Sequence, residues 1–108
     1  MKQKTLKRSS KIVKVVIKPS TKQEKKKMAV FTKENGMKKT VHFGQAGAPD
    51  YTITKDKKQR KRYLSRHKAR ENWNDPMTAG ALSRWILWGP YTSQKENIQL
   101  FKHKFKLR

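Results

Sequence analysis

All three tryptophans of this 108-residue chain lie in residues 43–89, which read FGQAGAPDYTITKDKKQRKRYLSRHKARENWNDPMTAGALSRWILWG. This stretch joins a glycine-containing loop, a basic segment and a nearly all-apolar segment. The flanking residues are mostly lysine, spaced by β-branched or aromatic residues. We therefore expect the rest of the chain to be organised around residues 43–89.

The basic segment of this stretch predicts an amphipathic helix that begins near residue 57, with Asp56 or Thr54 as its N-cap, and ends between residues 70 and 72. At 100° per residue, one side carries only cations and the opposite side is largely apolar. The cations of this stripe are Lys58, Arg62, Arg66 and Arg70, and the opposite side carries Tyr63, Leu64 and His67. Four cations on one stripe repel each other unless an anion compensates, so we expect the stripe to bind a polyanion. A solvated charged face is the alternative.

The apolar segment, residues 78–88, predicts a helix that is buried on several sides and ends at Gly89-Pro90. One face of this helix should cover a sheet. Trp85 and Trp88 are candidate contacts with a partner protein, because Trp is a favoured anchor residue at interfaces. A place in the protein's own core is the alternative for both tryptophans.

The residues before this stretch predict a three-stranded antiparallel sheet. Strands are expected over residues 11–18, 28–33 and 37–43, because each segment is short and rich in β-branched or aromatic residues. Asn35-Gly36 is the strongest hairpin signal in the chain, because this pair accepts the positive φ angles of a type I′ turn. Residues 44–53 then form a loop that lacks the Gly-Lys-Ser/Thr ending of a phosphate-binding P-loop.

The residues after this stretch predict a short helix and then an extended arm. Ser93 and Glu96 match a capping box, so a helix should run to about Phe101. From there the chain alternates apolar and basic residues with period two, as in an edge strand or an arm bound in a neighbour's groove. Phe101 and Phe105 are therefore candidate partner contacts, and stacking on nucleic-acid bases is the alternative.

These patterns together predict an α+β fold with one small domain and two basic arms. The domain is a three-stranded antiparallel sheet followed by two or three short helices. The predicted boundaries are residues 1–10 for the N-terminal arm, 11–89 for the domain (sheet 11–43, loop 44–53, helices 54–89) and 90–108 for the C-terminal helix and arm.

The net charge is the strongest functional signal. With 29 Lys and Arg residues against 7 Asp and Glu, the chain carries a formal charge of +22. Such an excess is normally neutralised by nucleic acid, an anionic membrane or an acidic protein surface. Apolar runs such as residues 85–88 are far too short to cross a bilayer, so no membrane span is expected.

The chain offers little for catalysis or metal binding. It has no cysteine, which excludes disulfides, thiolate metal sites and Cys nucleophiles. Its three histidines have no second ligand at metal-binding spacing, and the few acids are scattered without a paired base. We expect no enzyme activity, catalytic residue, metal, cofactor or small-molecule substrate.

The order of short motifs along residues 40–88 resembles a family of small uncharacterised basic proteins of large double-stranded DNA viruses, such as those of algae and amoebae. The motifs are TVHFG, DYT, KD, YL, RH, REN-W and SRW-LW, at residues 40–44, 50–52, 55–56, 63–64, 66–67, 70–73 and 83–88. The resemblance implies a viral setting in which a basic protein is packaged in the particle. Both arms lie outside the resemblance.

The expected function is that of a structural virion protein, either a minor capsid or an internal component. It would bind neighbouring capsid proteins through its basic arms and tryptophan helix, and its cations would meet acidic capsid patches or the packaged double-stranded DNA. It would reside in the virion, and in the host cytoplasm or nucleus during assembly. The alternative is a sequence-independent DNA- or RNA-binding protein that condenses the genome, and composition alone also allows a ribosomal protein.

Overall fold

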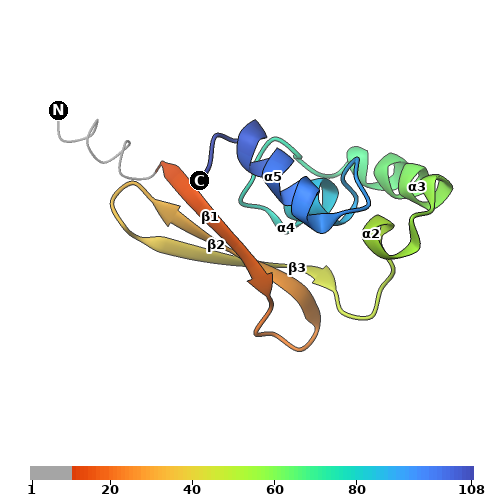
Figure 1. Cartoon of the computed structure of the whole chain (residues 1–108), viewed down its shortest axis with the longest axis horizontal. Helices are drawn as coiled ribbons and strands as arrows, with labels where there is room; N and C mark the ends of the chain where they lie inside the picture. The colour runs from red at the N-terminus through yellow and green to blue at the C-terminus, as the bar shows by residue number, and fades with distance from the viewer. Residues whose placement is uncertain (1–10) are drawn as a thin grey trace.

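A three-stranded antiparallel sheet packs under a layer of short helices in the computed structural model, which describes residues 11–108 (Figure 1). The strands are β1 (Ile12–Pro19), β2 (Lys25–Lys33) and β3 (Lys38–Gln45), in the order β1-β2-β3. The helices are α2 (Tyr51–Thr54), α3 (Lys57–Lys68), α4 (Ala79–Leu82), the π-helical turn η1 (Ser83–Leu87) and α5 (Gln94–Lys104). The predicted α+β class and sheet are confirmed. The predicted arm at residues 1–10 lies outside the described residues.

The alternation of side chains along the strands leaves one face of the sheet buried and one open. Val15 pairs with Phe31 and Ala29 with Val41, and this inner face lies against the helices. The outer face carries Val16, which is 40% exposed, and several exposed lysines. These lysines are Lys14, Lys18 and Lys38. The sheet is therefore amphipathic, with a cationic outer face.

The helix layer fills the core above the sheet. Leu82, Ile86 and Leu87 come from α4 and η1, and Phe101 comes from α5; all four are buried. Gly44 of β3 lies directly under this layer, because a Cβ at that position would lie 2.8 Å from Leu87 Cδ1. The predicted apolar helix over residues 78–88 is thus confirmed as the element that covers the sheet.

The β2–β3 hairpin has a different turn from the predicted type I′ turn. Gly36 has a φ of +89°, but Asn35 does not have a positive φ. Gly36 N donates to Lys33 O (2.9 Å) and Lys33 N donates to Met37 O (2.7 Å). This pattern is a three-residue loop with a type I turn and a left-handed glycine, so the position of the hairpin is confirmed and its turn type is wrong.

Strand β2 and the loop after β3 also differ from the prediction. β2 begins at Lys25 instead of residue 28, because Lys25 and Lys27 pair with Gln45 and Phe43. The predicted loop at residues 44–53 contains the first turn of α2, where the Asp50 carboxylate accepts a hydrogen bond from Thr52 N. Lysine is depleted in strands, which is why the early start of β2 was not predicted, whereas Asp50 is an ordinary N-cap residue that the sequence analysis assigned to the loop.

The C-terminal arm is helical where the sequence predicts alternation. α5 continues to Lys104, so Phe101 and Phe105 lie one turn apart with ring centroids 4.9 Å from each other. Only the last residue joins the sheet: Arg108 N donates to Val13 O (3.0 Å), and Val15 N donates to Arg108 O (2.9 Å). No helix in residues 11–108 is long and apolar enough to cross a membrane.

Candidate nucleic-acid interface

Helix α3 presents the predicted cationic stripe to solvent. Asp56 is its N-cap, and its carboxylate accepts hydrogen bonds from the backbone N–H groups of Lys58 and Gln59. The helix ends at Lys68, earlier than predicted. All four stripe residues are exposed: Lys58, Arg62 and Arg66 lie on α3, and Arg70 lies just beyond its last turn.

The inner side of α3 fastens the stripe to the rest of the molecule. Tyr63 stacks on Trp88 of the segment after η1, with ring centroids 4.2 Å apart and planes 5° apart, and His67 stacks on Tyr63 at 4.1 Å. Arg60 Nε donates to the carbonyl oxygens of Trp88 (3.1 Å) and Gly89 (3.0 Å). Sequence reasoning did not single out Arg60, a helix cation that faces inward and caps the end of η1.

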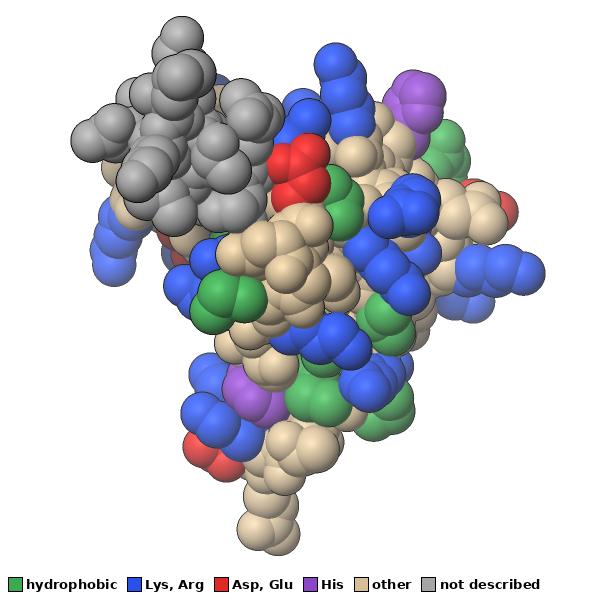
Figure 2. All heavy atoms as spheres, turned by 90° about the vertical axis from the view of Figure 1, so that its left-hand side faces the viewer, with side chains coloured by type: hydrophobic (Ala, Val, Ile, Leu, Met, Phe, Trp, Pro, Cys, Tyr) green, Lys and Arg blue, Asp and Glu red, His purple; other side chains and the backbone are tan. Residues whose placement is uncertain are grey.

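Almost none of the cationic charge is neutralised within the molecule. In the part of the chain that the structure describes, Lys26 is the one lysine or arginine with a carboxylate within 4.0 Å, and its partner is Asp50 at 2.5 Å. Figure 2 shows Lys and Arg side chains scattered over the described part of one face, with few acidic side chains among them. The cations of α3 and of the outer sheet face are therefore available to an external anion.

Two of the four candidate partner contacts are not on the surface. Trp88 is 7% exposed and Phe101 is 0% exposed. Both side chains therefore lie in the protein's own core and not at a partner surface; this is the alternative stated for Trp88, whereas a core position was not predicted for Phe101. A chain of this size needs its largest aromatic side chains to fill a single core.

Trp85 and Phe105, the other two candidates, are half-buried. The Trp85 indole N–H donates to Trp73 O (2.8 Å), and the ring lies within cation–π distance of Arg84 (4.2 Å) and Lys104 (4.6 Å). Phe105 packs against the core beside Phe101. Contact with a partner through Trp85 and Phe105 stays a prediction.

A fully buried asparagine that sequence reasoning missed holds the end of η1 in place. Asn97 of α5 donates through Nδ2 to Ile86 O (3.0 Å) and Tyr91 O (2.8 Å), and its Oδ1 accepts from Tyr91 N (3.0 Å). A Cβ on Gly89 would lie 2.6 Å from that Oδ1, so glycine is required at this close approach. The available signal was the i, i+4 spacing of Asn97 and Phe101 on one helix face.

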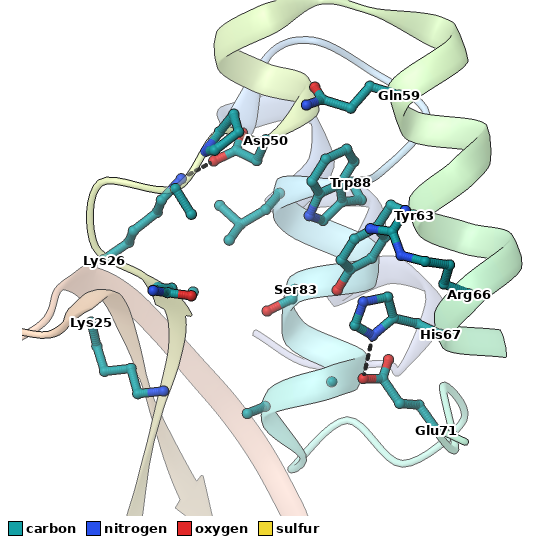
Figure 3. A pocket seen from close by; sticks show the side chains of 17 residues that line it. Lys25, Lys26, Asp50, Gln59, Tyr63, Arg66, His67, Glu71, Ser83 and Trp88 are labelled. Carbon is teal, nitrogen blue, oxygen red and sulfur yellow. Dashed lines mark hydrogen bonds and ion pairs between the residues drawn. The ribbon is translucent and has the colours of Figure 1, made fainter. Parts of the chain in front are cut away.

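A cleft of about 480 Å³ separates the ends of β2 and β3 from α3 (Figure 3). Lysines from β2 form one wall, α3 forms the opposite wall, and η1 forms the floor. Its lining includes Lys25, Lys26, Arg66, Ser83, Leu87 and Trp88. Because four elements distant in sequence build this cleft, no local pattern predicts it.

The cleft contains an acid–base pair that the sequence analysis held to be absent. His67 Nδ1 lies 3.0 Å from Glu71 Oε2, one helical turn away, and the Trp73 indole N–H donates to Glu71 Oε1 (2.9 Å). The i, i+4 spacing of His67 and Glu71 was the missed signal. No group of three or more potential metal-ligating side chains occurs in residues 11–108.

Burial changes the acidity of two groups beside the cleft. Burial, followed by the charge of Glu71, raises the pKa of Tyr63 from 10.0 to about 12, although a hydrogen bond with Ser83 opposes the change. Burial and the nearby Arg60 lower the pKa of Arg84 from its ordinary value. The Arg84 guanidinium lies over the Trp73 and Trp85 rings, and its buried Nε has no hydrogen-bond partner.

Stability should fall at alkaline pH because of Tyr63. Its pKa is higher in the folded state than in the unfolded state, so its contribution is complete below pH 10 and is lost as the pH rises towards 12. We expect the free energy of unfolding of the wild type to fall more steeply over this range than that of Tyr63→Phe. Urea titrations between pH 8 and about 12 measure the free energy of unfolding of both proteins. Subtracting one curve from the other removes the contribution of lysine titration, which both proteins share. Parallel curves would contradict the assignment.

A comparison with known protein families finds a match that covers most of the sheet and α3. Residues 15–67 match a family of unknown function, DUF5754. The matched range runs from β1 to the last turn of α3, so similarity to this family includes Lys58, Arg62 and Arg66 and stops before η1. No curated protein and no solved structure matches the chain.

Proposed function

We propose that the protein is a non-enzymatic, sequence-independent nucleic-acid-binding protein. Its cationic surface, with α3 at its centre, binds the phosphate backbone of double-stranded DNA or RNA. The observation that carries the proposal is the unneutralised charge of the exposed cations on α3. In residues 11–108, Lys26 of β2 is the one lysine or arginine with a carboxylate within 4.0 Å. Phosphate contacts supply most of the affinity of non-specific binding.

The spacing along α3 supports contact with several phosphates. Lys58, Arg62 and Arg66 follow each other at intervals of four residues, about 6 Å apart along the helix axis. Each long cationic side chain can therefore reach a separate phosphate. Such contacts position a protein on nucleic acid and carry no sequence information directly, so we infer binding without base specificity.

A structural role in a virus particle is the second candidate. The resemblance of residues 40–88 to proteins of large double-stranded DNA viruses supports this setting. The cations also cover more than one face of the molecule, on α3 and on the outer sheet face, as suits a protein with acidic neighbours on several sides. Its partners would be acidic patches of capsid proteins, and Trp85 and Phe105 would supply half-buried aromatic contacts.

A salt series on the wild-type protein tests the first proposal. We expect two duplexes of unrelated sequence to bind with equal affinity, and the affinity to fall steeply with salt, by roughly 0.9 log-log slope units per phosphate contact. Fluorescence anisotropy at five salt concentrations gives both results. A Kd above about 10⁻⁴ M at physiological salt, weaker than ordinary non-specific binding, would overturn the proposal and favour an acidic protein neighbour.

A further inference from the structure

We propose that the cleft beside α3 binds a single nucleotide unit, with its phosphate between Lys25 and Arg66 and its base against the apolar floor of η1. This inference goes beyond the proposed function, which concerns the phosphate backbone of a duplex, because it concerns one nucleotide of an unpaired strand. A free mononucleotide and a nucleotide of a single strand share this chemistry, and the experiment below separates them.

The size of the cleft fits a nucleotide better than a bare anion. Its volume of about 480 Å³ lies within the range of about 300–1,000 Å³ typical of small-molecule sites. A phosphate ion alone would leave most of this space to water. Leu87 and Trp88 supply an apolar floor, and the Ser83 side chain projects from η1 towards the open space (Figure 3).

The lining of the cleft has a small excess of positive charge, with Lys25, Lys26 and Arg66 against Asp50 and Glu71. Both carboxylates in its walls are already satisfied: Asp50 accepts from Lys26 Nζ and Thr52 N, and Glu71 is bound to His67 and Trp73. Among residues 11–108, no carboxylate lies within 4.0 Å of Lys25 or Arg66. They belong to opposite walls of the cleft, one on β2 and the other on α3 (Figure 3). Each of these two walls therefore presents a cation to an anion in the cleft.

The cleft favours an unpaired strand over a duplex. A base inside a duplex reaches such a cleft only after it leaves the stack, which costs a few kcal/mol. A single strand avoids this cost. Helix α3 carries Arg66 at the boundary between its exposed stripe and the cleft, so a strand that follows the stripe passes the entrance.

The test is an NMR titration of the full chain with adenosine 5′-monophosphate, inorganic phosphate, a short single-stranded oligonucleotide and a duplex of equal length. We expect the mononucleotide to shift the backbone amides of Gly44 and Gln45, at the end of β3, and of Ser83, in the floor of the cleft. Equal affinity for inorganic phosphate would overturn the assignment of the base to the floor. Shifts centred on Lys58 and Arg62 would overturn the cleft as the site.

A substitution that fills the cleft without changing charge separates this inference from the proposed function. Ala79 is exposed at the start of α4 and lines the cleft, so Ala79→Phe should weaken binding of the mononucleotide and of the single strand by about tenfold. Duplex binding by the outer stripe should stay within about twofold. Ala69→Phe, at an exposed position outside the cleft, is the matched control.

A charge substitution supplies the second, independent readout. Lys25→Gln should weaken mononucleotide binding by about tenfold, whereas Lys22→Gln, an exposed neighbour outside the cleft, should not. Unchanged mononucleotide affinity in both Ala79→Phe and Lys25→Gln overturns the inference even if duplex binding is strong. If the wild-type protein binds the mononucleotide but not the duplex, the proposed function is overturned and this inference is not. If the single-stranded oligonucleotide binds in the cleft and the free mononucleotide does not, the bound nucleotide belongs to a single strand.

Discussion

Replacing Arg62, Arg66 and Arg70 together by Gln is expected to flatten the salt dependence of duplex binding by about three log-log slope units. Each arginine is exposed and, within the described residues 11–108, has no carboxylate within 4.0 Å, so each can displace a condensed counterion from nucleic acid. Loss of three such contacts also lowers the affinity most at low salt. Fluorescence anisotropy of the wild type and the variant over the same salt series measures both quantities.

The matched control removes three charges from the opposite part of the surface. Lys14, Lys18 and Lys38 are exposed on the outer face of the sheet, and their replacement by Gln changes the net charge equally. If α3 is the binding surface, the sheet variant retains most of the slope. Equal flattening in both variants would indicate that the whole surface binds without a preferred face. An unchanged slope in the arginine variant, with an unchanged circular dichroism spectrum, would exclude α3.

The cationic stripe was predictable because its pattern is local. An N-cap aspartate followed by cations at intervals of four residues specifies the helix, its beginning and its outer side without reference to the rest of the chain. The three strands were predictable for the same reason, since β-branched runs alternate within a few residues. The turn type was not, because Asn35-Gly36 suits both a type I′ turn and a type I turn with a left-handed glycine.

The C-terminal segment shows how a local pattern is overridden by packing. The alternation at residues 101–107 has period two, yet Phe101 and Phe105 also have helical i, i+4 spacing. The helical spacing wins because it places both rings against the core formed by the sheet and η1, and because Asn97 extends the same face to the end of η1. The cleft was unpredictable because Lys25, Arg66 and Ser83 are brought together only by this packing.

The two tryptophans of the apolar helix should respond very differently to the same substitution. Trp88 is buried and stacks on Tyr63, so Trp88→Ala is expected to lower the free energy of unfolding by about 3–5 kcal/mol. Trp85 is half-buried, and Trp85→Ala removes one hydrogen bond and two cation–π contacts, for a loss of about 1–2 kcal/mol. Urea denaturation monitored by circular dichroism measures both values.

This difference determines how a test of particle incorporation must be designed. The free energy of unfolding of a small domain is only about 5–15 kcal/mol. Trp88→Ala therefore removes much of this stability, and part of the variant population is unfolded. Failure of that variant to enter a particle would then report loss of folding, and Trp88→Phe, which keeps a ring against Tyr63, should restore most of the stability. Trp85→Ala remains folded and is the variant that tests contact with a neighbour. Equal losses of stability for Trp85→Ala and Trp88→Ala would contradict the packing described for η1.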